Sequence, residues 1–280
     1  METNTTQNSV PVTQEIAQPE SEIKKKHISF SELYVWNKCA FLHKQQYIER
    51  LVKSDKNHYL TFGTALHHIC EHHIHDSLEQ QNEIFKKVFK EGLEKEEVPI
   101  TEQEFDEYCK QASKLFVNIL PTLLKQFGEG FKIVQAELPL YEKIDFFLDE
   151  EYYFKGFIDL VIEDSSGKIH LIDWKTTSWG WDLRKRSDKM TTYQLTLYKI
   201  FYSLKYDVDP KNIDIHFILL KRTAKPDSNI EVYSVPCGEI KMKNCKLFLK
   251  NALYNIVKER YIKNRSSCGF CSLNKTELCP

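Results

Sequence analysis

Two acidic residues and one lysine are spaced so that they could share a divalent cation. The segment 168–177 (KIHLIDWKTT) reads as a strand, and the two-residue period of a strand places Asp173 and Lys175 on one face. Asp159 lies as far before Ser166 as Asp173 lies after it, so a hairpin centred on Ser166 brings the two carboxylates face to face. Directly opposed residues have Cβ atoms about 4.5–5.5 Å apart, close enough to bind one ion. The pattern predicts a site for Mg²⁺ or Mn²⁺.

A third carboxylate strengthens this interpretation against an ordinary alternative. Glu137 lies in the apolar stretch IVQAELPL, which reads as a neighbouring strand, and could supply another oxygen ligand. A single Asp-x-Lys pattern also occurs where surface residues form a simple salt bridge. Acidic residues on adjacent apolar strands favour the metal site, because buried like charges are costly unless a cation balances them.

The residues around the paired aspartates form a recognisable motif. GFIDLV, a glycine-containing turn and then LIDWKTT resemble the catalytic hairpin of the PD-(D/E)XK nuclease superfamily, specifically its RecB-like branch. Ile158 precedes Asp159 where other branches carry proline, and the RecB-like branch commonly lacks that proline. The resemblance implies a restriction-endonuclease-like core in which Asp159, Asp173 and Lys175 are catalytic.

Two further segments match the same branch in the same chain order. FGTALHHI resembles its G-T-x-x-H helix, which implies that His67 is a metal ligand. YQLTLY resembles its Q-L-x-x-Y helix, which implies that Gln194 and Tyr198 lie beside the active site. His68 and His72, four residues apart on the same predicted helix, could also bind zinc by themselves.

By this resemblance the chain is expected to be a metal-dependent DNA exonuclease. His67, Glu137, Asp159 and Asp173 would hold Mg²⁺ or Mn²⁺, and Lys175 would orient the attacking water and stabilise the developing negative charge. The alternatives are a structure-specific endonuclease, a catalytically silent DNA-binding subunit, or a zinc-stabilised interaction protein. The expected substrates are DNA ends or single strands in recombination, repair or phage DNA processing. Any unwinding would need a helicase or recombination partner, because the chain lacks a G-x4-GKT motif.

Three cysteines lie within twelve residues near the end of the sequence, at Cys268, Cys271 and Cys279. The resemblance supplies a fourth, Cys39, because some RecB-like nucleases hold an iron–sulfur cluster with one N-terminal cysteine and a C-terminal triplet. Four thiolates suit either a 4Fe-4S cluster or tetrahedral zinc, and their spacing does not choose between them. The family favours the 4Fe-4S cluster, with zinc as the alternative.

The composition and the pattern of elements indicate how these residues are positioned. The 280 residues are 41% hydrophobic and 28% charged, which is ordinary for a globular protein. We expect an α/β fold: a restriction-endonuclease-like core with a central mixed sheet flanked by helices, and an N-terminal helical region. Residues 1–26 read as a disordered tail, and 27–280 as one nuclease domain with a helical insertion at about 80–128. Helices are expected at about 29–50, 61–78, 82–97, 101–127, 190–206 and 238–263, and strands at 132–141, 152–163, 168–177, 213–220 and 230–235.

Charge is segregated along the chain although the net charge is only -1. Residues 71–107 hold twelve acidic and four basic side chains, whereas 238–265 hold eight basic and two acidic. Arg184, Lys185, Arg186 and Lys189 add a basic run that DNA could follow, beside Trp179 and Trp181 as candidates for base stacking. No secretory signal or membrane span is recognisable, so we expect a cytoplasmic protein without a membrane partner.

Overall fold

The computed structural model describes residues 26–52, 57–146 and 151–280. The helices are α1 (Phe30–Lys38), α2 (Ala40–His43), α3 (His58–His72), α4 (Leu78–Glu96), α5 (Glu102–Phe127), α6 (Leu183–Ser187), α7 (Lys189–Tyr206) and α8 (Glu239–Val257). The strands are β1 (Lys26–Ser29), β2 (Lys132–Lys143), β3 (Tyr152–Glu163), β4 (Ile169–Thr177), β5 (Ile213–Lys221) and β6 (Ile230–Ser234). A π-helical turn (Lys44–Ile48) follows α2, and 3-10 turns lie at Pro210–Asn212, Pro226–Ser228 and Arg265–Phe270.

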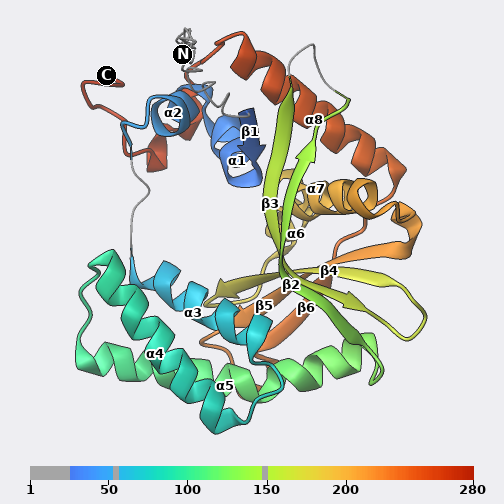
Figure 1. Cartoon of the computed structure of the whole chain (residues 1–280). Coiled ribbons are helices and arrows are strands. Elements are labelled where there is room, and N and C mark those ends of the chain that lie inside the picture. Colours follow the sequence, from blue (N-terminus) through green and yellow to red (C-terminus); the bar gives the residue numbers. More distant parts are fainter. Residues whose placement is uncertain (1–25, 53–56, 147–150) are drawn as a thin grey trace, which may run out of the picture.

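The strands form one mixed sheet in the order β1-β3-β4-β5-β6, with β2 paired to β3 (Figure 1). β2 runs antiparallel along most of β3. β1 pairs in parallel with the first residues of β3, and β4 pairs antiparallel with its last residues. β4 and β5 are parallel, while β5 and β6 are antiparallel. The expected mixed sheet flanked by helices is confirmed.

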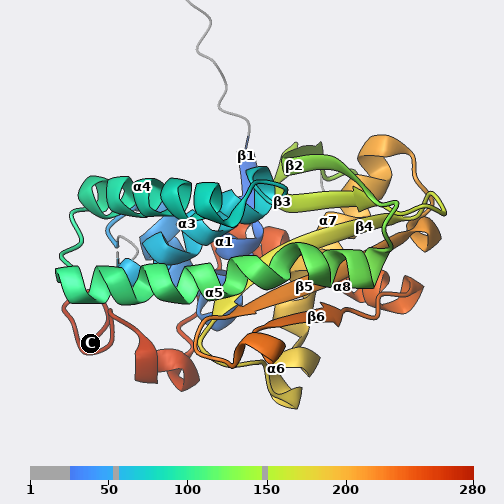
Figure 2. The same cartoon turned by 90° about the horizontal axis from the view of Figure 1, so that it is seen from below.

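Helices cover both faces of the sheet and enclose two hydrophobic cores. The first core lies between the sheet and α1, α7 and α8, and the second lies between the sheet and α3, α4 and α5 (Figure 2). Along β5, Phe217 faces the first core and Ile218 the second, as strand alternation requires. In β3, Ile158 faces the first core but Leu160, two residues later, faces the second. The side of β3 that faces the first core before Asp159 therefore faces the second core after it.

The expected helix over 29–50 is interrupted. It begins as predicted, because the Ser29 side chain accepts a hydrogen bond from the Glu32 backbone N–H and caps α1. Cys39 then adopts an extended conformation with φ −162° and ψ 114°, which ends α1 and starts α2. The prediction of one continuous helix was therefore wrong. The helical spacing of apolar residues continues past Cys39, although the backbone of Cys39 is not helical.

Two other helices end earlier than predicted. The helix expected at 61–78 stops at His72, and a separate helix, α4, begins after Ser77, whose side chain forms a capping box with Gln80. The last helix, expected to reach residue 263, ends at Val257, and Glu259 follows in the left-handed region with φ 53°. Neither β1 nor α6 was expected, because each is only four or five residues long.

The helices α4 and α5 occupy the region expected as an insertion and pack against α3 below the sheet (Figure 1). Their contact is aromatic: Phe89 of α4 stacks on Phe105 of α5 and meets Phe62 of α3 edge-on. This packing buries the apolar face of α3, which includes Phe62, Leu66 and Ile69. The predicted tail falls on residues outside the described part of the chain, apart from Lys26, which begins β1. None of the described helices is both long enough and apolar enough to cross a bilayer.

Candidate metal centre

The paired aspartates lie where β3 and β4 separate. The register pairs Leu160 with Ile172, which places Asp159 opposite Asp173 just beyond the last paired residues. There the Asp159 Oδ2 atom accepts a hydrogen bond of 2.8 Å from the Trp174 backbone N–H. The predicted hairpin register is confirmed, and its open end presents the two carboxylates together.

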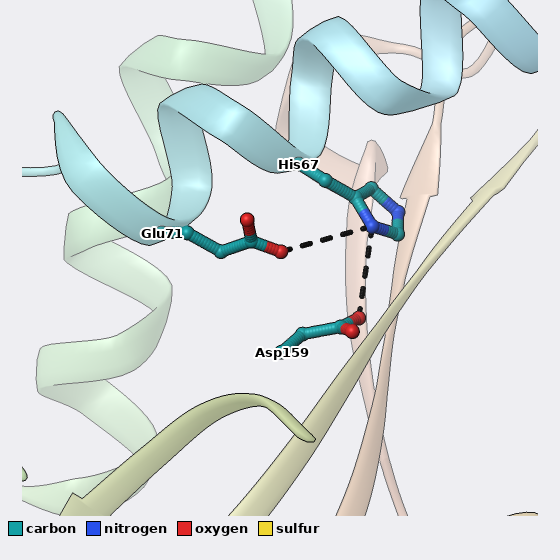
Figure 3. A group of neighbouring side chains, drawn as sticks. All are labelled: His67, Glu71 and Asp159. Carbon is teal, nitrogen blue, oxygen red and sulfur yellow. Dashed lines mark ion pairs between the residues drawn. The ribbon is translucent and has the colours of Figure 1, made fainter. Parts of the chain in front are cut away.

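Helix α3 adds a histidine and a second acidic residue to Asp159. His67 Nδ1 lies 3.6 Å from Asp159 Oδ2 and 3.9 Å from Glu71 Oε1 (Figure 3). One ligand atom from each of the three residues lies within 4.8 Å of the other two, an arrangement that could hold a metal ion. His67 was predicted from the sequence as a metal ligand, whereas Glu71 was not. Its position four residues after His67, on the same helix face, was the available signal.

Burial controls the charge state of this cluster. It raises the pKa of Glu71 to about 9, and the neighbouring charge of Asp159 adds to the effect. It also raises the pKa of Asp159 to about 6, against the opposing effect of Lys175. Burial lowers the pKa of His67 to about 4, so the imidazole is neutral at physiological pH, the form that binds metals. The cluster thus holds two crowded carboxyl groups and a neutral imidazole. These donors fit a divalent cation, whose charge would balance the carboxylates.

Asp173 is held by side chains from its own strand and from α7. It is 1% exposed, its Oδ2 atom contacts the Lys175 ammonium, and its Oδ1 atom accepts a 2.6 Å hydrogen bond from Gln194 Nε2. Gln194 Nε2 also lies 3.2 Å from the Tyr198 hydroxyl, one helical turn along α7. Burial raises the pKa of Asp173 to about 6, although Lys175 opposes the change. The structure thus brings together Asp173, Lys175, Gln194 and Tyr198, as the sequence analysis expected.

A glycine makes room for Tyr198. A Cβ atom on Gly156 would lie 2.8 Å from Tyr198 Cε1, which is closer than real Cβ contacts come. The glycine of GFIDLV therefore allows the Tyr198 ring to pack against β3, three residues before Asp159. This contact links Gly156 to Tyr198 and, through Gln194, to Asp173.

Glu137 lies beside the cluster but not within the set formed by His67 and Asp159. Its backbone is left-handed, with φ 44°, and the pairs on either side of it in β2 place it opposite Asp159. Its Oε2 atom lies 3.5 Å from His72 Nε2, and it forms a second three-residue group with His72 and Glu71. Glu71 thus belongs to both groups. The His68 ring packs on His72 at 5.1 Å, and these two form no three-ligand group of their own within the described residues.

The four predicted cysteine ligands line one cavity of about 280 Å³, although 229 positions separate Cys39 from Cys268. Asn264 closes this cavity: its backbone N–H lies 3.4 Å from Cys39 Sγ, and its side chain donates to the Lys38 carbonyl. In the described chain no three of the four sulfur atoms lie within 4.8 Å of one another. Tetrahedral thiolates about 2.3 Å from a single zinc ion would be about 3.8 Å apart. The four thiols therefore share one cavity, but as placed they do not form a set of three ligand atoms close enough for a single ion.

The expected basic run divides into paired and exposed residues. Arg186 forms an ion pair with Glu231, and its Nε atom donates to the Trp181 carbonyl. Trp181 packs on Phe217 with ring centroids 5.0 Å apart, whereas Trp179 is 70% exposed. Arg186 and Trp181 therefore stabilise the fold, and Trp179 is the aromatic residue still accessible to a ligand.

Comparison with known proteins places this arrangement in a family. The family model of the PD-(D/E)XK nuclease superfamily matches residues 27–279. The chain belongs to this superfamily. In this PD-(D/E)XK protein, Asp173 and Lys175 lie where β3 and β4 separate, within the mixed α/β fold of the superfamily.

The solved structures agree on the fold. This PD-(D/E)XK chain is similar to the crystal structure of a candidate exonuclease from Eubacterium rectale, with a TM-score of 0.58 and 14% identity over 96% of this chain and 95% of that one. At this identity the likeness shows the fold alone. A second similarity, to the crystal structure of SSO0001, has a TM-score of 0.36 and 13% identity over 87% and 93% of the two chains, and carries no argument. No curated protein sequence matches the chain.

Proposed function

We propose that this protein is a metal-dependent deoxyribonuclease that removes nucleotides from DNA ends. The observation that carries the proposal is the grouping of Asp159, Asp173 and Lys175 at the open end of one hairpin, with His67 facing Asp159. Carboxylate oxygens and one neutral imidazole suit Mn²⁺ or Mg²⁺. A divalent ion bound there would polarise the scissile phosphate and lower the pKa of a bound water.

The protein side chains would divide the remaining work. Lys175, next to Asp173, would orient the attacking water and stabilise negative charge as it develops on the phosphate oxygens. Gln194 would fix the orientation of Asp173 through its 2.6 Å hydrogen bond, and Tyr198 would hold Gln194.

The experiment compares linear and covalently closed circular DNA, single- and double-stranded, with Mg²⁺, Mn²⁺ or EDTA. Loss of linear DNA only, dependent on metal and abolished in Asp173→Ala, supports the exonuclease. Cleavage of closed circles would instead indicate a structure-specific endonuclease. Absence of hydrolysis under all conditions, with DNA binding intact, would indicate a silent DNA-binding subunit.

We also propose that Cys39, Cys268, Cys271 and Cys279 bind a 4Fe-4S cluster, as in RecB-like nucleases. Their convergence on one cavity of about 280 Å³ supports a group shared by all four thiols. Iron, zinc and acid-labile sulfide should be measured in anaerobically purified protein, beside Cys271→Ala and the control Cys109→Ala in α5. Stoichiometric zinc without iron would favour the zinc-stabilised alternative.

The biological setting we propose is DNA recombination, repair or phage DNA processing. An exonuclease of this kind acts on ends or on unpaired strands, and a helicase or recombination partner would supply the unwound strand. Co-purification of the tagged protein with an ATP-dependent helicase, reproduced with purified components, would test this association.

A further inference from the structure

A cavity of about 640 Å³ extends from the candidate metal centre between the first turns of α3 and the end of β4. His67 and Lys175 form one end of it, and Arg222, directly after β5, lines it as well. Its volume lies within the range of about 300–1,000 Å³ that is usual for small-molecule sites. Because two residues of the proposed hydrolytic site form part of its wall, a strand bound at that site would continue into this space.

Arg222 is fixed in this wall by neutral partners. Its Nη1 atom donates to Gln111 Oε1 at 3.1 Å, its Nη2 atom donates to Ser178 Oγ at 2.8 Å, and its backbone N–H donates to the Thr177 carbonyl. Its guanidinium also lies 5.1 Å from the centre of the Tyr59 ring. The residue is therefore held in one orientation from several elements.

No carboxylate among the described residues forms an ion pair with this charge. Among the ion pairs of the described residues none includes Arg222, whereas Arg186 and Lys221 both pair with Glu231. An arginine anchored by neutral groups, half-buried and facing a cavity, keeps its charge available for an anion.

Two further donors in the same wall lack a partner. The indole Nε1 of Trp174 and the hydroxyl Oγ1 of Thr176 are buried, and neither makes a hydrogen bond within the described part of the molecule. Both atoms are covered by the protein, so neither is open to a ligand in the cavity, and the case for an anion here rests on Arg222.

Tyr59 adds an aromatic surface at this cavity. It lies in the first turn of α3 and is 53% exposed, with the Arg222 guanidinium over its ring and the His58 ring centre 4.2 Å from its own. An exposed tyrosine next to a fixed arginine is a platform on which an unpaired base can stack while its phosphate meets the guanidinium. A paired base would have its faces covered by its neighbours in the duplex.

We propose that this cavity is a nucleotide subsite that binds an unpaired nucleotide of the DNA strand next to the bond being cleaved. Arg222 contacts its phosphate and Tyr59 stacks on its base. The proposal rests on the proposed function, since it names the form of DNA that the same site takes: a strand that is single-stranded beside the scissile bond.

The first experiment measures binding without hydrolysis. Fluorescence anisotropy in EDTA compares a short single-stranded oligonucleotide with its duplex, using wild type, Arg222→Gln and the matched control Arg50→Gln, an exposed arginine outside the cavity. A charge-assisted contact predicts that Arg222→Gln weakens single-strand binding about 10-fold to 100-fold. We expect Arg50→Gln to stay within about twofold, because exposed surface charges contribute little.

The second experiment pairs the variant with a change in the substrate. Oligonucleotides with one methylphosphonate linkage, moved position by position from the cleavage site, remove one phosphate charge at a time. In wild type one position should lower kcat/KM about 10-fold or more, and in Arg222→Gln that position should cause no further loss, because the partner is already absent. Arg222→Lys keeps the charge and should retain part of the loss in kcat/KM at that position. It replaces Arg222→Gln if thermal unfolding shows the glutamine variant to be misfolded.

The outcomes separate this proposal from the proposed function. The subsite would be overturned, even if DNA is hydrolysed, if a folded Arg222→Gln binds single strands as tightly as wild type. It would also be overturned if every methylphosphonate lowers kcat/KM by the same factor in Arg222→Gln as in wild type. Binding that depends on Arg222, in a wild-type protein that hydrolyses no DNA with either metal, would support the subsite and reject the nuclease.

Discussion

Replacing Glu71 with glutamine should make the metal-free protein more stable at neutral pH. The Glu71 side chain is 5% exposed and makes no hydrogen bond within the described residues, and its nearest partner is His67 Nδ1 at 3.9 Å. Its folded pKa of about 9 lies well above its ordinary value of 4.5. The folded state must therefore keep a proton at pH 7 that the unfolded state releases, and this costs free energy of folding.

The size of the effect follows from the shift. Between pH 4.5 and pH 7 the unfolded carboxyl loses its proton while the folded one keeps it, and each pH unit costs about 1.4 kcal/mol. The penalty at pH 7 is therefore up to about 3 kcal/mol, and the uncharged amide of Glu71→Gln avoids it. Below pH 4.5 both states hold the proton, so the advantage of the variant should vanish there. It should grow as the pH rises toward 9.

Urea unfolding in EDTA at a series of pH values measures this difference directly. Glu83→Gln, an exposed glutamate of α4, is the matched control and should show no comparable gain. Saturating Mn²⁺ should then stabilise wild type more than Glu71→Gln, since the ion balances the carboxylate that the variant lacks. A Glu71→Gln protein that is no more stable than wild type in EDTA at pH 7 would refute the argument from burial.

Three further changes test other parts of the site. Lys175→Gln should lower kcat about 10²-fold to 10³-fold, because it removes a charge that stabilises the transition state, while Lys90→Gln on the surface of α4 should not; equal rates for the two would contradict the role of Lys175. Gly156→Ala should force the Tyr198 ring away from β3, cost about 1–3 kcal/mol in unfolding free energy and lower kcat, and an unchanged denaturation midpoint would show that the close contact is unimportant. Cys279→Ser should lower both metal content and unfolding temperature if the four cysteines share one group, and Cys109→Ala should leave the metal content unchanged.

The hairpin of the candidate site could be predicted because its determinants are local. A turn at Ser165 to Gly167 and two apolar segments of matching length fix the register, and the register alone places Asp159 opposite Asp173. The start of α5 was predictable for the same reason, since Thr101 and Glu104 form a capping box within one turn.

Other features depend on contacts between distant parts of the chain and were missed. Glu71 lies between two pairs of histidines and reads as a surface residue, and only the position of α3 against Asp159 of β3 shows it to be buried. β1 forms because it meets Tyr152 to Lys155 of β3, more than one hundred residues later. Arg222 carries no local signal, since its role as a cavity residue arises from Gln111 in α5 and Ser178 after β4.

The convergence of Cys39 on residues 264–279 has a consequence for the order in which a growing chain can assemble. All residues assigned to the carboxylate centre lie between His67 and Tyr198, so every side chain of that centre is synthesised before Cys268. The cysteine cavity instead needs three thiols that are synthesised more than two hundred residues after the first. Closing so long a loop carries an entropic cost that binding of a shared group would offset. The cavity therefore closes only after residue 279 has been synthesised, and its occupancy would report that synthesis and folding have reached that residue.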